Sequence, residues 1–176
     1  MGRDKAFLEI DGAPLWQRQL RILRDLSPDE IFIAGAAREE WLASDCTTIP
    51  DAQPDAGPLA GLAAALRRST TPLLLALAID LPAMTSDYLR KLLALSSDAR
   101  GIIPRGQDRF EPLAAVYPAS GLPLAQSCLD SGRYSLQAFA ERCIADRLLA
   151  AKPIATAENL LFFNLNTPKD LSTFLS

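Results

Sequence analysis

The sequence of 176 residues contains no histidine. This absence excludes catalytic triads built on serine, histidine and aspartate, histidine general bases, and metal sites made of imidazole ligands. Any chemistry must therefore use carboxylates, lysine, arginine, backbone amides or a bound cation.

Cysteine is scarce, and long hydrophobic runs are missing. The three cysteines, Cys46, Cys128 and Cys143, are far apart, show no metal-ligand spacing and leave one unpaired in any disulfide scheme. Reduced thiols are the simpler interpretation. No apolar run has the length of a membrane span, and the N-terminal residues show no signal-peptide hydrophobic region. We therefore expect a cytoplasmic protein that does not bind membranes.

Positive charge is not in excess, because the formal net charge is −3. Such a chain has no general attraction for nucleic acid or anionic lipid, so a phosphate ligand must be held by local geometry or by a metal. The hydrophobic fraction of 49% comes mostly from alanine and leucine rather than aromatic residues. This composition and length predict one ordered domain over residues 1–176, with a small-molecule site and no nucleic-acid partner.

Helical and strand patterns alternate along the chain. Periodicity, caps and proline positions predict helices at residues 14–26, from Pro58 to the Thr71–Pro72 break, and at 86–95, 119–130, 135–143 and 168–175. Short apolar or β-branched runs predict strands at residues 30–35, 47–50, 73–79, 101–104, 112–117 and 160–163. The alternation predicts an α/β fold, with a mostly parallel sheet covered by helices on both faces.

Asp80 follows the strongest strand of the pattern, Leu73–Ile79, and Leu81–Pro82 prevents that strand from continuing. In open α/β sheets, ligands bind beyond the carboxyl ends of the strands. A carboxylate there suits Mg²⁺, which prefers oxygen ligands and takes one or two carboxylates together with substrate phosphates. A cap at a strand end explains Asp80 equally well on pattern alone.

Asp51 and Lys5 are weaker candidates. Asp51 also follows a strand, and it could bind a nucleotide or a metal-bound water, although its neighbours have ordinary turn composition. Lys5 could neutralise charge on a transferred phosphoryl group, or belong to a solvated cluster of charges. On sequence alone, an ordinary turn is favoured for Asp51 and a solvated charge cluster for Lys5.

Further candidates lie in turns and at a helix start. Gly57-Pro58 and Gly61 surround a helix N-terminus that could hold an anion, or they form a tight loop. Glu111 flanks a turn between two predicted strands, where it could reach a ligand or shape a hairpin. Asn164 and Asn166 project to the same side of an extended segment, and their amides could bind a substrate or cap a turn.

Seven segments, taken in order, resemble the molybdenum cofactor guanylyltransferase (MobA-like) family of nucleotidyltransferases. Each is weak alone, but their order over essentially the whole chain is specific. They are Met1–Lys5, Gly12–Leu15, Pro50–Asp51, Gly57–Gly61, Asp80–Pro82, Glu111–Leu113 and Asn164–Pro168.

The resemblance implies a Rossmann-like three-layer α/β/α fold and transfer of GMP from GTP to molybdopterin, with release of pyrophosphate. Under it, Lys5 contacts the nucleotide phosphates, Asp51 helps to bind GTP, and Asp80 holds Mg²⁺; Lys5 and Asp80 are then the catalytic pair. Glu111, Asn164 and Asn166 are assigned to the substrate side of the cleft. The resemblance also allows transient contact with molybdenum cofactor biosynthesis or acceptor proteins.

The chain departs from the family pattern in two places. Family members begin with an apolar strand and a glycine-rich phosphate loop, whereas this sequence starts at the downstream end of that loop. Without that strand, we expect unpaired sheet edges and exposed apolar surface. Ala34 stands near a position where some members carry an asparagine that contacts the base, which weakens the guanine assignment.

Two alternatives therefore remain open. The first is a molybdopterin cytidylyltransferase, or a sugar or polyol nucleotidyltransferase of the same fold. The second is a nucleotide-binding or partner-binding relative without catalytic activity, since the phosphate loop is absent from the sequence. Competition between nucleotides separates the first from a guanylyltransferase, and the effect of Asp80→Ala on Mg²⁺-dependent GTP binding addresses the second.

Overall fold

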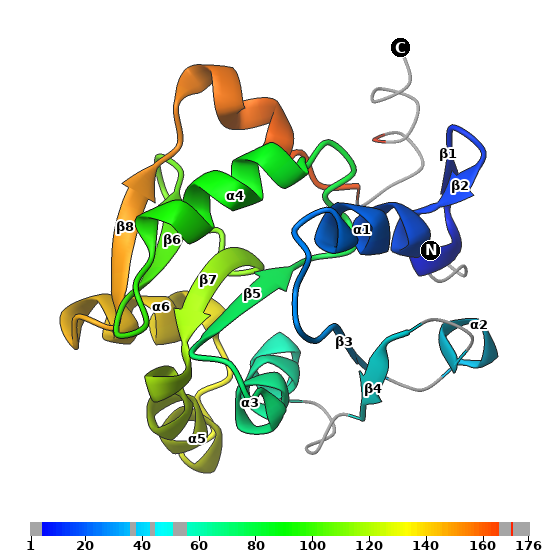
Figure 1. Ribbon diagram of the computed structural model, residues 1–176. Coiled ribbons are helices and arrows are strands. Elements are labelled where there is room, and N and C mark those ends of the chain that lie inside the picture. Colours follow the sequence, from blue (N-terminus) through cyan, green and yellow to red (C-terminus); the bar gives the residue numbers. More distant parts are fainter. Residues whose placement is uncertain (1–4, 36–37, 43–44, 51–55, 166–169, 171–176) are drawn as a thin grey trace.

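The computed structural model describes all residues except 1–4, 36–37, 43–44, 51–55, 166–169 and 171–176 (Figure 1). Its main sheet has four strands in the order β5-β7-β6-β8. β7 is antiparallel to both β5 and β6, whereas β8 is parallel to β6, so three strands run in one direction and β7 runs against them. The bounds are Leu73–Leu77 for β5, Gly101–Arg105 for β6, Ala114–Pro118 for β7 and Leu149–Pro153 for β8.

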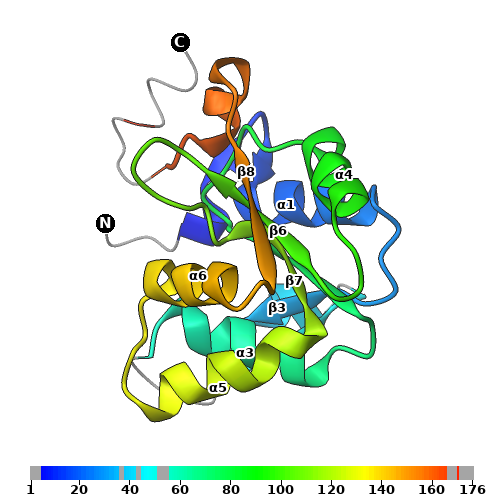
Figure 2. The same cartoon turned by 90° about the vertical axis from the view of Figure 1, so that its left-hand side faces the viewer.

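Helices cover both faces of this sheet, which confirms the α/β class and the three-layer α/β/α arrangement. Buried residues of α3, α5 and α6 form one core cluster with one face, and those of α4 form a second cluster with the other, joined by the end of α1 (Figure 2). None of the described helices is long and apolar enough to cross a membrane. The bounds are Leu15–Arg24 for α1, Pro58–Arg68 for α3, Ser86–Leu95 for α4, Leu122–Asp130 for α5 and Leu136–Ala145 for α6.

A small hairpin precedes α1. Its strands, β1 (Glu9–Ile10) and β2 (Ala13–Pro14), are antiparallel and joined by two residues with positive φ, Asp11 at 51° and Gly12 at 74°. Two positive φ angles in succession give the turn that best matches the twist of paired strands. The hairpin follows a short 3₁₀ helix, η1 (Lys5–Phe7), and it leads the chain into α1.

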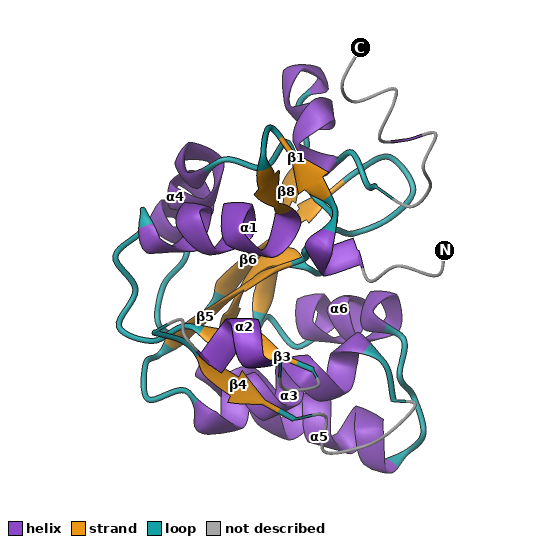
Figure 3. Cartoon of the chain, turned by 90° about the vertical axis from the view of Figure 1, so that its right-hand side faces the viewer, coloured by secondary structure: helices purple, strands orange, loops and turns teal. Residues whose placement is uncertain are grey.

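A second sheet contains β3 (Phe32–Ala34) and β4 (Thr47–Ile49), which run parallel, with the short helix α2 (Glu39–Leu42) between them in sequence (Figure 3). In the described residues, β3 pairs only with β4 and β5 pairs only with β7. A cleft of about 880 Å³ separates β3 from β5, and most of its lining is aliphatic. The expected unpaired edges and apolar surface are therefore present.

The sequence interpretation was wrong near the end of the described chain. Residues 160–163 were predicted to be a strand, but the structure has a 3₁₀ helix, η3 (Thr156–Phe162), and the last strand is β8. The Glu158 carboxylate accepts a hydrogen bond from the Ala155 N–H at 3.1 Å, which favours a turn here. The predicted helix at 168–175 lies largely outside the described residues.

β8 was not predicted, because its sequence, Leu-Ala-Ala-Lys-Pro, has no β-branched or aromatic residue. Only Leu149 of this strand is fully buried, and the strand pairs through its backbone along β6. Tertiary pairing therefore determines its conformation. The remaining strand predictions agree with β3, β4, β5, β6 and β7 to within a few residues.

The ion pair between Lys152 and Glu158 joins β8 to η3, with Nζ and Oε2 2.8 Å apart and both side chains about one-fifth exposed. The hydrogen bond from Lys152 lowers the pKa of Glu158, and the same bond raises the pKa of Lys152 against the opposing effect of desolvation. Each charged form is therefore favoured in the folded state.

We expect Glu158→Gln to lower the free energy of unfolding at pH 7 by about 0.2–1 kcal/mol. The carboxylate contributes fully above its unfolded pKa of about 4.3 and loses this contribution as pH falls through the lower folded pKa, so the difference from the parent chain should shrink in acid. Urea denaturation between pH 3 and 7 measures it. Glu141→Gln, at an exposed position of α6, is the control. A difference that grows on acidification would contradict the assignment.

Candidate functional site

Asp80 lies just beyond the carboxyl end of β5, as the sequence predicted, and its backbone is held from two sides. The Asp80 carbonyl accepts a hydrogen bond from the Leu165 N–H at 3.0 Å. Gln19 Nε2 donates to the carbonyls of Leu81 at 2.8 Å and Ile79 at 3.4 Å. These contacts stop the strand from fraying and fix the point from which the Asp80 carboxylate projects.

Lys5 meets Asp80 although 75 positions separate them in the sequence. Lys5 Nζ lies 3.4 Å from Asp80 Oδ2, and the two side chains are 34% and 23% exposed. The pair is thus accessible to a ligand but partly withdrawn from water, which strengthens its electrostatic interaction with an incoming phosphate. Ala6, the next residue, is buried and secures η1 against the body of the protein.

A small apolar cluster brings three distant segments to this point. Ile10 from the hairpin, Leu15 from α1 and Leu165 from the C-terminal segment are buried together, with Ile79 packed against them. Asn164, next to Leu165, is therefore close in the fold to Asp80, and its Nδ2 donates to the Phe162 carbonyl at 3.3 Å. The cluster is the physical reason that Lys5, Asp80 and Asn164 share one edge of the sheet.

Glu111 lies in the loop between β6 and β7, also at the carboxyl edge of β5, because the neighbouring Leu113 carbonyl accepts a hydrogen bond from the Ala78 N–H. Its carboxylate pairs with Arg109 at 3.3 Å and is 16% exposed. Burial raises the pKa of Glu111, and the Arg109 charge lowers it by less. Among the described residues, no hydrogen bond or ion pair joins Glu111 to Asp80; Glu111 pairs with Arg109 instead.

The other predicted site residues divide in two groups. Asp51 and Asn166 lie outside the described residues. Gly57 precedes the N-terminus of α3 with a positive φ of 63°, which a side chain would strain, and Pro58 occupies the first turn as predicted. Gly57 and Gly61 also line the cleft between β3 and β5.

Two residues of this region were missed. Arg38 follows β3, and its guanidinium lies 5.2 Å from the Phe7 ring centroid and 5.7 Å from that of Trp41, so a positive charge is held near η1. Gln19 is 6% exposed although it is polar. A glutamine on the apolar face of the α1 pattern, between Leu15 and Leu20, was the available signal for a buried hydrogen-bonding role.

The small number of carboxylate side chains at the site limits how a metal could bind. In the part of the chain that the structure describes, no group of three or more cysteine and carboxylate side chains converges on a metal position. Asp80 offers one partly exposed carboxylate, which fits Mg²⁺ held mainly by nucleotide phosphates and water. Asp80, with Lys5 beside it, could therefore contribute one ligand to a cation that is held mainly by a polyphosphate.

The chain is similar to known proteins over most of its length. Residues 1–148 match the family model described as MobA-like NTP transferase domain. The chain is 33% identical over 173 residues to a probable molybdenum cofactor guanylyltransferase of Opitutus terrae, covering 97% of this chain and 86% of the relative. A relative of the same description from Pelotomaculum thermopropionicum is 29% identical over 179 residues, with 97% and 83% covered.

Solved structures show the same fold. Molybdopterin-guanine dinucleotide biosynthesis protein A from Archaeoglobus fulgidus superposes with a TM-score of 0.76 and 26% identity, covering 98% of this chain and 89% of that one. The 2-C-methyl-D-erythritol 4-phosphate cytidylyltransferase from Thermus thermophilus gives a TM-score of 0.70 at 16% identity, with 96% and 91% covered. The second similarity concerns the fold alone.

Replacing Gln19 by methionine tests the support beneath Asp80. We expect Gln19→Met to lower the free energy of unfolding by about 1–3 kcal/mol, because the carbonyls of Ile79 and Leu81 lose their donor while the side-chain length is kept. Gln17→Met, at an exposed position of the same helix, should change it by less than about 0.5 kcal/mol. Chemical denaturation measures both. Equal effects of the two changes would show that Gln19 does not hold the strand end.

Proposed function

Because the chain belongs to the MobA-like NTP transferase domain family, we propose that it transfers GMP from GTP to molybdopterin and releases pyrophosphate. Relatives that match nearly the whole chain carry the description of molybdenum cofactor guanylyltransferase. The single structural observation that carries the proposal is the Lys5–Asp80 pair at the carboxyl end of β5. The proposal assigns one member of this pair to a metal and the other to the charge of the phosphates.

In the proposed reaction, a phosphate oxygen of molybdopterin attacks the α-phosphorus of GTP. A new bond forms between that oxygen and phosphorus, while the bond from the α-phosphorus to the oxygen bridging to the β-phosphate breaks, and its electron pair leaves with pyrophosphate. The attacking phosphate is already ionised near neutral pH. No general base is needed, which is compatible with a chain that lacks histidine.

Asp80 is proposed to hold Mg²⁺ together with the GTP phosphates, and the bound metal would neutralise the charge that develops on them. Asp80 would contribute through its position, as a ligand, rather than through proton transfer. The hydrogen bonds from Leu165 and Gln19 fix the backbone around Asp80 before substrate arrives, so little reorganisation is needed when the triphosphate binds.

Lys5 is proposed to move its ammonium group from Asp80 to the nucleotide phosphates. Its ion pair with Asp80 is 3.4 Å long and partly solvated, so exchanging one oxygen partner for another requires no buried charge to be left unpaired. The two residues remain neighbours during the exchange. Lys5 would then offset the negative charge on the leaving pyrophosphate.

Asn164 and Glu111 are proposed as substrate-side residues, with Asn164 nearer to Asp80 than its position in the sequence suggests. Asp51 is proposed to help bind GTP, and Asn166 to join Asn164 on the pterin side. These four assignments rest on the family motifs. Contact with other proteins of molybdenum cofactor biosynthesis or with acceptor proteins is likewise a proposal.

The test is molybdopterin-dependent release of pyrophosphate from GTP with Mg²⁺ present. Asp80→Asn keeps the side-chain shape but removes the charge, and we expect turnover to fall by about 10²-fold or more. Asp98→Asn is the matched control. Asp98 is exposed and lies just before the amino end of β6, whereas Asp80 lies beyond the carboxyl end of β5. A parallel reaction contains CTP as a competitor of GTP and measures which nucleotide is used. Full activity of Asp80→Asn would contradict the assigned role, and preference for CTP would overturn the guanine assignment.

A further inference from the structure

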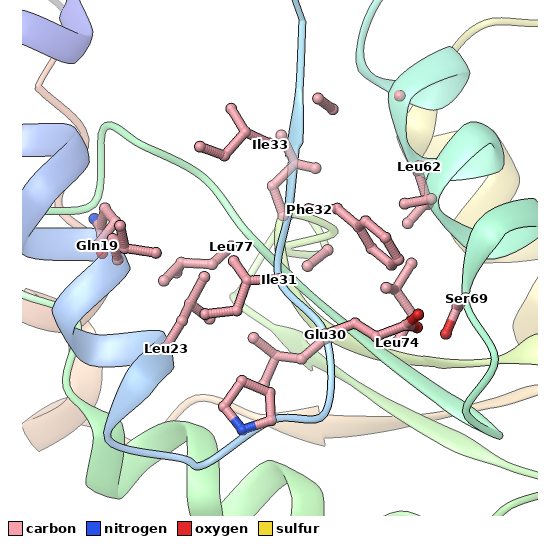
Figure 4. Close-up of a pocket in the computed structure, with 18 of the residues that line it drawn as sticks. Gln19, Leu23, Glu30, Ile31, Phe32, Ile33, Leu62, Ser69, Leu74 and Leu77 are labelled. Atoms are coloured by element: carbon pink, nitrogen blue, oxygen red, sulfur yellow. The ribbon is translucent and has the colours of Figure 1, made fainter. Parts of the chain in front are cut away.

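The cleft between β3 and β5 supplies no positive charge for an anionic substrate. Figure 4 shows Leu23, Leu62 and Leu77 directed toward this space from three different elements. Among the described residues that line it, the charged ones are Asp29 and Glu30, and both are acidic. An acceptor that carries a phosphate therefore needs positive charge from another part of the carboxyl edge of the sheet.

The loop between β6 and β7 is a short hairpin, and we call residues 105–111 the arginine hairpin. Its two arms are paired through the backbone. Glu111 N–H donates to the Pro104 carbonyl, and Gly106 N–H donates to the Arg109 carbonyl, both at 2.9 Å. The path of this loop is therefore set by its own hydrogen bonds.

Helix α6 holds the arginine hairpin at Phe110. Gln137 Oε1 accepts a hydrogen bond from the Phe110 N–H at 3.0 Å, and Gln137 Nε2 donates to the Phe110 carbonyl at 2.8 Å. The Phe110 ring is buried in the core cluster that contains α5 and α6. Arg105, its partner in an antiparallel bridge, places its guanidinium 5.2 Å from the centre of this ring. The backbone and the side chain of Phe110 are thus both fixed against α6.

Arg109 and Glu111 flank Phe110 and point away from the core that holds its ring, because alternate residues of an extended segment face opposite sides. Their side chains pair there, with Arg109 Nε donating to Glu111 Oε1 at 3.3 Å. The Glu111 side chain is 16% exposed, whereas that of Arg109 is 63% exposed. The carboxylate therefore holds the inner end of the guanidinium and leaves its outer end in solvent.

The outer end of the Arg109 guanidinium carries the two Nη groups. Among the described residues, neither Nη group has a hydrogen-bond partner, because the pair with Glu111 uses Nε. Two Nη donors in one plane match two oxygens of a phosphate, and such charge-assisted pairs are stronger than neutral hydrogen bonds. Since Glu111 already orients the guanidinium, less side-chain freedom is lost when an anion binds.

The arginine hairpin joins the sheet beside the strand end that carries Asp80. The Leu113 carbonyl accepts a hydrogen bond from the Ala78 N–H at 2.6 Å, which ties the chain after the hairpin to the end of β5. Asp80 follows Ala78 by two residues. Glu111 precedes Leu113 by the same interval. The hairpin and Asp80 therefore leave neighbouring strand ends at the same edge of the sheet.

From these observations, we propose that the Nη groups of Arg109 bind the terminal phosphate of the acceptor, and that Glu111 and Gln137 are positioning residues for Arg109. The ligand class is a phosphate monoester. Two of its oxygens would pair with the guanidinium, and a third would remain for attack on the α-phosphorus. This inference rests on the proposed function, because it names the group that holds the acceptor of that reaction.

Steady-state kinetics with molybdopterin, GTP and Mg²⁺ test the role of Arg109. We expect Arg109→Gln to raise the KM for molybdopterin at least about tenfold and to leave the KM for GTP within about twofold. Arg109→Lys keeps the charge without the planar pair of donors, so it should restore only part of the loss. Arg100→Gln is the matched control, because Arg100 is exposed and lies just before the amino end of β6.

A double variant tests the positioning role of Glu111. Glu111→Gln leaves the Arg109 side chain in place but weakens its orientation, so we expect a rise of about threefold in the KM for molybdopterin. Combined with Arg109→Gln, it should cause no further rise, because the group that it positions is already absent. A separate structural role of Glu111 would instead give effects that multiply. Circular dichroism checks that each variant folds.

Binding measured without turnover separates this inference from the proposed reaction. Calorimetry compares molybdopterin with its dephosphorylated form, on the parent chain and on Arg109→Gln. We expect the parent chain to prefer the phosphorylated form at least about tenfold, and Arg109→Gln to lose most of that preference, because the same contact is removed from either side.

Three results would overturn the inference. An unchanged KM for molybdopterin in Arg109→Gln, with a parent chain that releases pyrophosphate, would reject the Arg109 site and leave the proposed function standing. An equal rise in the KM for GTP would assign Arg109 to the nucleotide. An equal effect of Arg100→Gln would indicate general attraction of anions. A parent chain that releases no pyrophosphate, yet prefers the phosphorylated pterin through Arg109, would reject the proposed reaction and support the phosphate site.

Discussion

The hydrogen bond from the Leu165 N–H to the Asp80 carbonyl, 3.0 Å long, ties the C-terminal segment to the end of β5. Around it, Ile10, Leu15 and Leu165 exclude water, and Gln19 holds the carbonyls on either side of Asp80. A strand end is normally free to fray, and a carboxylate placed there would have no fixed direction. Here the anchored strand end fixes the backbone from which the Asp80 carboxylate projects.

The sequence predicted the parts of the site that depend on local pattern. Asp80 stood out because a continuous apolar run ends at it, and such a run has few other interpretations in a folded domain. The helix start at Pro58 was equally clear, because proline suits a first turn. The pairing of Lys5 with Asp80 was not predictable from pattern, since the apolar cluster that brings them together draws on three distant segments.

The two errors in the strand predictions, at residues 160–163 and at β8, have the same physical origin. Leu160–Phe163 has strand composition, but the Glu158 carboxylate and its bonds to Ala155 and Lys152 stabilise a 3₁₀ turn instead. β8 has weak strand composition, yet its backbone pairs along β6. In both places a contact between separate segments outweighed local preference. The place of Gln19 on the apolar face of α1 indicated a buried hydrogen-bonding role, but its partners, the carbonyls of Ile79 and Leu81, are known only from the structure.

The cleft and the site are neighbours in the structure. Ala6 lines the cleft, and Lys5, the adjacent residue, carries the ammonium group that meets Asp80. Ile79 also lines the cleft and is followed by Asp80. The order of the sheet at this point and the position of the charged pair are therefore physically connected.

We propose that a metal and a nucleotide meet at the carboxyl end of β5. Paramagnetic line broadening by Mn²⁺, used in place of Mg²⁺ with GTP present, tests it most directly. We expect the backbone signals of Asp80, Leu81, Lys5 and Leu165 to broaden first. Mn²⁺ without GTP should have a much weaker effect, because the described residues contain no cluster of carboxylates that would hold the ion alone. Broadening centred on Glu111 and Arg109, or equal broadening without GTP, would contradict it.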